Sequence, residues 1–205
     1  MTPAYDAVLF DFDGVLVDSE PIHFNAWVET LRPVGVSVSW EGYKSNCIGI
    51  SDRELLTYFG SLASPPLEPD TLTECYSAKK RTFGLKIAEM DPLTPETVAM
   101  IRSLRGRKLA VVTSSGRLEV EPVLRKAGVY EFMDALVFSE DVSRRKPDPE
   151  PYLLAAARLG ARNPLVVEDS VAGIASGRAA GFDVLEVTHP DEVPTRVRAA
   201  LGLSG

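Results

Sequence analysis

Cysteine is scarce in this chain. Only two cysteines occur among 205 residues. Cys47 and Cys75 lack the spacing of a metal-ligand pair, and we expect both to be free, partly buried thiols in a reducing compartment. The sequence therefore points away from a disulfide-stabilised fold.

Long apolar runs and an excess of positive charge are also missing. No run approaches the roughly 20 apolar residues that a membrane-spanning helix needs, and the N-terminus has no basic leader followed by an apolar stretch. The formal net charge is -7, so nucleic acids and anionic membranes would be repelled at long range. We therefore expect a cytoplasmic protein that binds neither nucleic acid nor membrane, and in which any phosphate chemistry depends on local charge.

What the chain does contain is an ordinary globular composition, 45% hydrophobic and 25% charged. Short apolar runs alternate with segments of helical spacing, which predicts parallel strands covered on both faces. This alternation is typical of an α/β fold with a doubly wound, Rossmann-like parallel sheet. The predicted strands are residues 7–10, 109–112, 135–138, 165–167 and 184–187, and two predicted helices are 118–127 and 151–159.

A long insertion separates the first two predicted strands. It spans about a hundred residues, far more than one crossover connection needs. Residues 21–31, 52–59 and 71–83 have helical spacing there, and no convincing strand occurs. We therefore predict a discontinuous α/β core of residues 1–18 and 91–205, with an inserted helical domain of residues 19–90 above the carboxyl ends of the strands.

Two acidic pairs directly follow predicted strands: Asp11 with Asp13, and Glu168 with Asp169. Reactive groups gather at the carboxyl edge of an open α/β sheet, and crowded carboxylates there favour a cation. Magnesium prefers hard oxygen ligands and bridges naturally to phosphate. Taken alone, each pair also has a simpler explanation, because Asp11 and Asp13 could be solvated turn residues and Asp169 could cap a helix.

A hydroxyl-rich turn and a lysine complete the pattern. The second strand ends in Thr113-Ser114-Ser115-Gly116, which could hold a phosphoryl oxygen, although such residues also form turns and helix caps. Lys146 starts a proline-flanked turn suited to compensating phosphate charge, although a run of charges is usually a solvated surface. The groups occur in the order acid pair, hydroxyl, lysine and acid pair, each at the end or in the loop of a successive predicted strand, which makes coincidence a poor explanation.

The set of four motifs resembles that of the haloacid dehalogenase-like superfamily, within it the group containing β-phosphoglucomutase and small sugar-phosphate phosphatases. The resemblance covers essentially the whole chain. The matching residues are Asp11-Phe12-Asp13-Gly14-Val15-Leu16 for the first motif, Thr113 for the second, Lys146 for the third and Glu168-Asp169 for the fourth.

This resemblance implies a role for each matching residue. Asp11 would attack phosphorus and form an aspartyl-phosphate, while Asp13 would act first as acid and then as base. Thr113 and Lys146 would hold the transferring phosphoryl group, with Ser114 and Ser115 as further substrate-binding candidates.

The resemblance also implies bound Mg²⁺. The ion would be held by Asp11, the backbone carbonyl of Asp13 and Asp169, with Glu168 as a further candidate ligand.

The helical insert resembles the family's mobile cap, which excludes water from the site. Residues 21–27 are similar to a β-phosphoglucomutase stretch in which a histidine orients the acid/base aspartate, so His23 is a candidate. A histidine whose hydrogen bonds are satisfied at the base of the cap, with no catalytic role, fits equally well. Lys79 and Lys80 lie near where the family often has a substrate-binding lysine, and an exposed helix face explains them as well.

Three functions remain open on the sequence. We favour Mg²⁺-dependent hydrolysis of a small phosphorylated metabolite such as a sugar phosphate. A hexose-phosphate mutase is the alternative, although Gly49-Ile50-Ser51-Asp52 puts Arg53 one position later than the mutase pattern. The third is a catalytically silent phosphometabolite-binding module, which ranks last because no motif is missing.

Overall fold

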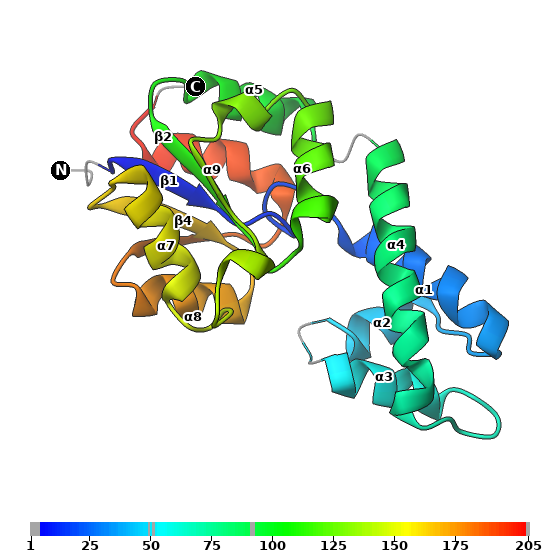
Figure 1. Cartoon of the computed structure of the whole chain (residues 1–205). Coiled ribbons are helices and arrows are strands. Elements are labelled where there is room, and N and C mark those ends of the chain that lie inside the picture. The colour runs from blue at the N-terminus through cyan, green and yellow to red at the C-terminus, as the bar shows by residue number, and fades with distance from the viewer. Residues whose placement is uncertain (1–4, 49, 51, 91–92, 204–205) are drawn as a thin grey trace. The chain divides into compact units, whose positions relative to one another are not determined.

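The computed structural model describes residues 5–48, 50, 52–90 and 93–203. The chain divides into two compact units, one of Met1–Ser19 with Asp91–Gly205 and one of Glu20–Met90 (Figure 1). The first is an α/β unit, and the described residues of the second form helices and their connecting loops, with no strand.

A single parallel sheet forms the α/β unit, in the order β3-β2-β1-β4-β5. From β1 the chain steps outward through β2 to β3, and then returns to β4 on the other side of β1. This reversal makes the fold doubly wound, as predicted, and places a topological switch point between β1 and β4. The strands are β1 (Ala7–Phe10), β2 (Lys108–Val112), β3 (Ala135–Val137), β4 (Pro164–Glu168) and β5 (Asp183–Glu186).

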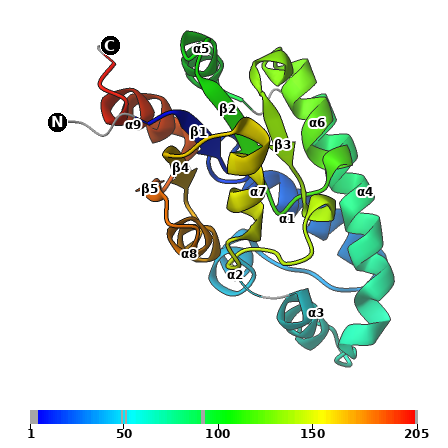
Figure 2. The same ribbon diagram turned by 60° about the vertical axis from the view of Figure 1, so that its left-hand side comes forward.

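Helices cover both faces of this sheet. Figure 1 shows α7 and α8 on one face and α5, α6 and α9 on the other, as right-handed crossovers in opposite directions require. In Figure 2, α7 and α8 both lie on the face that is turned forward. The helices are α5 (Pro95–Ser103), α6 (Arg117–Lys126), α7 (Glu150–Leu159), α8 (Val171–Ala179) and α9 (Val193–Ala200).

The two central strands explain why the acids meet. Every residue of β1 and β4 is buried, because both faces of a central parallel strand are covered and an apolar run satisfies both. The strands run in register, with Phe10 beside Val167. Asp11, which follows β1, and Glu168, the last residue of β4, therefore lie at the same edge of the sheet.

The helical unit has a core of its own. Its largest fully buried side chains include Trp27, Phe59 and Phe83, and the Trp27 and Phe59 rings lie 4.8 Å apart between centroids. Cys47 and Cys75 are free, as predicted, and both are buried. The helices are α1 (Glu20–Leu31), α2 (Trp40–Asn46), α3 (Asp52–Ser61) and α4 (Thr73–Glu89).

Several helices were absent from the sequence prediction. Helix α5 has a clear start, with Thr94 accepting a hydrogen bond from Thr97 N and a proline in the first turn, a signature that could have been found. Helix α2 is only 7 residues long, too short for a helical period to emerge. Helix α4 continues six residues past the predicted end at Phe83. None of the helices in the described ranges is both long and apolar enough to cross a membrane.

Candidate active site

Lys146 lies at the centre of the carboxyl edge of the sheet. Its Nζ donates to Asp11 Oδ1 at 2.7 Å, to Glu168 Oε1 at 2.6 Å and to the Val112 carbonyl at 2.9 Å. An ammonium group has three protons, so these three acceptors use all of them. The lysine therefore joins the ends of β1, β2 and β4.

Burial makes these charges strongly interdependent. The exposed fractions of the side chains are 5% for Lys146, 9% for Asp11 and 0% for Glu168. Burial raises the pKa of Asp11 well above its usual range, and the negative charges of Glu168 and Asp13 raise it further, against the opposing effect of Lys146. Burial alone would lower the pKa of Lys146, but Asp11 and Glu168 outweigh it and the pKa is raised. Lys146 is therefore held as a cation.

Glu168 accepts hydrogen bonds on both carboxylate oxygens. Oε1 accepts from Lys146 Nζ and from the hydroxyl of Tyr152 at 2.8 Å. Oε2 accepts from Asp169 N at 3.0 Å, and from Ser170 N at 3.0 Å and Ser170 Oγ at 3.1 Å. The carboxylate also lies against the first turn of α8, where a Cβ added to Gly173 would be 1.7 Å from Oε1.

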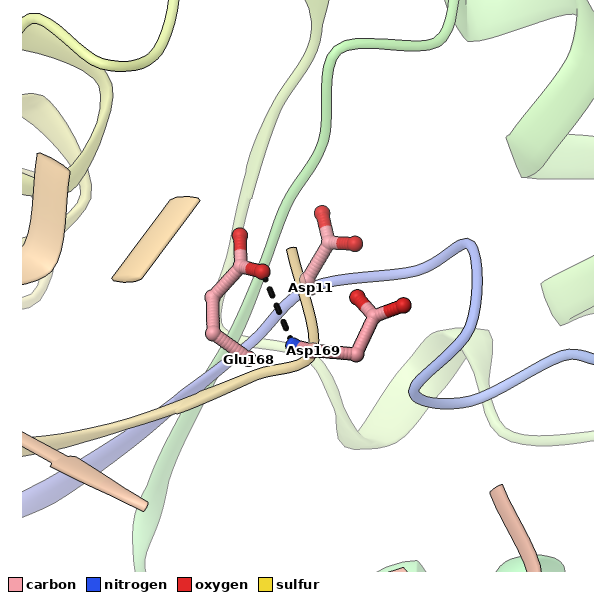
Figure 3. A group of neighbouring side chains, drawn as sticks. All are labelled: Asp11, Glu168 and Asp169. Carbon is pink, nitrogen blue, oxygen red and sulfur yellow. Dashed lines mark hydrogen bonds between the residues drawn. The ribbon is translucent and has the colours of Figure 1, made fainter. Parts of the chain in front are cut away.

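Asp11, Glu168 and Asp169 form a compact acidic group (Figure 3), in which one oxygen from each lies within 4.8 Å of the others. Oδ1 of Asp169 is buried and has no hydrogen-bond partner among the described residues. Burial, reinforced by the charge of Glu168, raises the pKa of Asp169 to about 6. An orphaned buried carboxylate oxygen beside other acids fits a divalent cation.

Asp169 does not cap helix α8, which was an alternative that the sequence left open. Helix α8 is capped by Ser170, whose side chain accepts from Gly173 N, and not by Asp169. Gly14 makes room for the Asp169 carboxylate, because a Cβ there would lie 2.1 Å from Oδ2 and the residue has φ +78. Asp169 is thereby left available to a ligand.

The hydroxyl turn after β2 lies at the same edge. Thr113 is buried and its Oγ1 accepts from Ser115 N at 3.0 Å. Ser115 Oγ donates to Asp13 Oδ2 at 2.6 Å, a contact that sequence reasoning did not find. Ser114 is exposed. The structure therefore brings Asp11, Asp13, Thr113, Ser115, Lys146, Glu168 and Asp169 together at one edge.

The other candidates belong to the helical unit. Lys79 is buried, and its Nζ lies 2.6 Å from His23 Nδ1. The direction of this hydrogen bond depends on the tautomer of the His23 ring. His23 stacks on Phe83 with centroids 4.0 Å apart. Lys80 is exposed and lies 4.7 Å from the Tyr76 ring centroid.

Arg53, which lies one position later than the arginine of the mutase pattern, is exposed in α3. Gly49 and Ser51, on which the comparison with the mutase pattern depended, lie outside the described residues.

Tyr152 is a site residue that the sequence analysis missed. It is fully buried in α7, and its ring centroid lies 4.9 Å from Lys146 Nζ. Burial and the nearby charges of Glu168 and Asp11 raise its pKa well above the usual value, so its hydroxyl remains a donor. A buried aromatic in an apolar helix is ordinary core from its spacing alone, and no sequence signal marked its hydroxyl.

Comparison with known proteins agrees with this geometry. The chain is 32% identical over 188 residues to a phosphorylated carbohydrates phosphatase of Thermotoga maritima, covering 90% of this chain and 86% of the relative. It is 30% identical over 191 residues to a fructose-1-phosphate phosphatase of Escherichia coli, covering 91% and 98%.

A solved structure of a mutant CbbY from Rhodobacter sphaeroides, in complex with xylulose-(1,5)bisphosphate, is also similar. Its TM-score is 0.70 at 27% identity, and the match covers 89% of this chain and 87% of that one. Residues 5–181 match the haloacid dehalogenase-like hydrolases as a family. The predicted resemblance is therefore confirmed, and the chain belongs to the haloacid dehalogenase-like hydrolase family.

Proposed function

We propose that this chain is a Mg²⁺-dependent phosphatase that hydrolyses a small phosphorylated carbohydrate through an aspartyl-phosphate. The observation that carries the proposal is the buried Lys146 ammonium, 2.7 Å from Asp11 Oδ1 beside an acidic group. Such a site combines a carboxylate nucleophile with positive charge next to the position of the transferring phosphoryl group. The relatives' activities on phosphorylated carbohydrates support the substrate class.

In the first step, an Asp11 oxygen attacks phosphorus and the bond from phosphorus to the sugar oxygen breaks. Asp13 gives its proton to the leaving oxygen, so the sugar departs as a neutral alcohol. In the second step, Asp13 takes a proton from water, and that water attacks the aspartyl-phosphate. Inorganic phosphate leaves, and Asp11 and the protonated Asp13 are regenerated.

The metal would be held by Asp11, Asp169 and the backbone carbonyl of Asp13. When bound, Mg²⁺ supplies positive charge that neutralises the crowded acids and the phosphoryl oxygens. Asp169 Oδ1 is the best-supported ligand atom, because it is buried and accepts no hydrogen bond within the described ranges. Glu168 is the weaker candidate, since its two oxygens already accept five hydrogen bonds.

The phosphoryl group would be received by the turn after β2. The Thr113 hydroxyl and the exposed Ser114 are available donors there, and Lys146 compensates the charge. Lys146 already donates all three protons, so a direct contact with phosphate requires that one of those hydrogen bonds be exchanged. Its electrostatic effect on the transition state needs no exchange.

We also propose that the helical unit is the cap, and that His23 and Lys79 contribute to substrate binding. Lys79 is a buried cation beside the Trp27 and Phe83 rings, at 5.8 and 5.0 Å. Its Nζ lies 2.6 Å from Nδ1 of His23, the other candidate, which makes Lys79 a better candidate than the exposed Lys80.

The proposal is tested by measuring phosphate release from a panel of phosphorylated carbohydrates, including fructose 1-phosphate and hexose 1-phosphates, with and without Mg²⁺. We expect release that depends on Mg²⁺ and is abolished in Asp11→Asn. The exposed Asp191→Asn serves as the matched control and should retain full activity. Full turnover by Asp11→Asn would refute the mechanism.

The same panel separates the alternatives. A mutase would interconvert hexose phosphates only with a bisphosphate primer and release little phosphate. A silent binding module would bind vanadate or a metal fluoride with Mg²⁺ and release no phosphate from any substrate.

A further inference from the structure

The buried hydroxyl of Tyr152 has no part in the mechanism above. It donates to Glu168 Oε1 at 2.8 Å, and both side chains are fully buried. Oε1 is also the atom that accepts from Lys146 Nζ at 2.6 Å. Tyr152 and Lys146 therefore meet on a single carboxylate oxygen, and the ring lies 4.9 Å from the same ammonium nitrogen.

Glu168 has little freedom to move away from this arrangement. Its other oxygen, Oε2, accepts from Asp169 N and from the amide and hydroxyl of Ser170. A carboxylate has about four lone-pair sites, and five donors surround this one. Gly173 lies against its remaining side, where a Cβ would be 2.0 Å from Cδ.

The position of Lys146 depends in turn on Glu168. Two of its three acceptors are carboxylates, Asp11 Oδ1 and Glu168 Oε1. A rotation of the Glu168 carboxylate would move Oε1 and draw the ammonium away from Asp11. Oε1 accepts from Lys146, which lies in a loop, and from Tyr152, which lies in α7 against the sheet. The Tyr152 hydroxyl is therefore held in place by the helix and can hold Oε1 in position.

We infer that Tyr152 is a positioning residue, whose hydroxyl orients Glu168 so that this carboxylate holds Lys146 against the nucleophile Asp11. The inference rests on the proposed phosphatase function and adds a residue to it. Tyr152 is fully buried and would contact neither substrate nor phosphoryl group. It acts through Glu168 and Lys146 on the charge that develops in the transition state.

The test compares Tyr152→Phe with Tyr43→Phe. Each change removes one largely buried hydroxyl that donates to a glutamate, since Tyr43 donates to Glu20 Oε2 at 2.9 Å in the helical unit. In Tyr152→Phe we expect kcat to fall roughly tenfold while KM changes by less than about twofold, because Lys146 acts mainly in the transition state. Vanadate, a phosphoryl analogue, should bind about tenfold more weakly for the same reason. In Tyr43→Phe, kcat and vanadate affinity should be unchanged.

Thermal unfolding of both variants separates positioning from packing. A lower Tm in both, with lower kcat only in Tyr152→Phe, supports the inference. Both kcat and vanadate affinity are measured at a temperature below the Tm of the variant. If Tyr152→Phe then has the wild-type values, the inference is overturned, whatever the change in Tm. A rise in KM with unchanged kcat also overturns it, because Tyr152 would then affect ground-state binding.

Failure of the proposed function would give a different result. In that case the wild-type protein itself releases no phosphate from any member of the panel. Wild-type turnover together with an unaffected Tyr152→Phe enzyme refutes the positioning role alone.

Discussion

Ser115 donates its side-chain hydroxyl to Oδ2 of Asp13 at 2.6 Å, across a sequence separation of 102 residues. The contact exists because β1 and β2 are neighbours in the sheet, in register from Ala7 with Lys108 to Phe10 with Val111. The hydroxyl fixes the orientation of the carboxylate that we propose as general acid and base. Ser115 is therefore expected to affect proton transfer.

Ser115→Ala should lower kcat/KM roughly tenfold for a sugar phosphate, because a misoriented acid protonates the leaving oxygen poorly. Nitrophenyl phosphate has a leaving group that needs no proton, so its kcat/KM should hardly change. Steady-state kinetics on both substrates make the comparison. Ser103→Ala is the control, since Ser103 Oγ donates to the Met100 carbonyl in α5. An equal loss of kcat/KM on both substrates in Ser115→Ala would contradict the assignment.

Lys146→Met should abolish activity and also destabilise the fold. The variant keeps most of the side-chain length but leaves the buried Asp11 and Glu168 without their shared cation. Removing one partner of a buried charge cluster costs about 3–5 kcal/mol of unfolding free energy, and loss of the cation should lower kcat by roughly a hundredfold or more. Urea denaturation and phosphate release measure the two effects.

The control for this change is Arg144→Ala, whose side chain is 70% exposed and pairs with Asp148 and Glu150. An exposed pair contributes less than about 1 kcal/mol. If Lys146→Met and Arg144→Ala lost the same free energy of unfolding, the buried contacts of Lys146 with Asp11 and Glu168 would not have the proposed importance for stability.

Gly173→Ala should displace Glu168. A Cβ at this position would lie 1.7 Å from Glu168 Oε1, and the Glu168 side chain is fully buried. We expect a loss of about 1–3 kcal/mol in unfolding free energy, with a fall in kcat. Gly84→Ala in α4 is the matched change, because nothing lies within 4 Å of its Cβ, and it should stabilise by about 1 kcal/mol. Wild-type kcat in Gly173→Ala would count against a role for Glu168.

The metal-free protein should become more stable as the pH falls from 7 to 5. Asp11 and Asp169 have raised pKa values in the folded state, to about 6 for Asp169. The folded state therefore binds more protons than the unfolded chain in this range, so the free energy of unfolding rises as pH falls through the folded pKa. Thermal unfolding in EDTA measures the slope, and Asp169→Asn should flatten it. A metal-free Tm that drops between pH 7 and 6 would contradict the prediction.

Added Mg²⁺ should reverse this dependence. A divalent cation favours ionised carboxylates, and a ligand at a hundredfold excess over its Kd stabilises the folded state by about 2.7 kcal/mol. We expect the Tm gain to be large at pH 7 and small at pH 5. Titrations with a calcium-free magnesium salt at pH 7 and pH 5 measure the gain in Tm. An equal gain at both pH values would exclude a site formed by Asp11 and Asp169.

The strands and the order of the motifs were predictable because they depend on local signals. Fully covered parallel strands need continuous apolar runs, and β1 and β4 have them. Parallel strands share one carboxyl edge, so placing Asp11 and Asp169 near one another needed only the strand assignments. Lys146 reaches the same edge from the loop between β3 and α7. The short helix α2 escaped prediction because seven residues cannot display a helical period.

The doubly wound fold class and the identity of the acids, the hydroxyls and the lysine at the sheet edge follow from the pattern of amino acids along the chain. How these groups divide their hydrogen bonds depends on the folded arrangement. Ser115 turns to Asp13, and Ser170 rather than Asp169 caps α8. The Tyr152 hydroxyl meets Lys146 on one oxygen of Glu168. The physical reason is that strand and motif patterns are set by neighbours along the chain, whereas these contacts join residues brought together only when the sheet assembles.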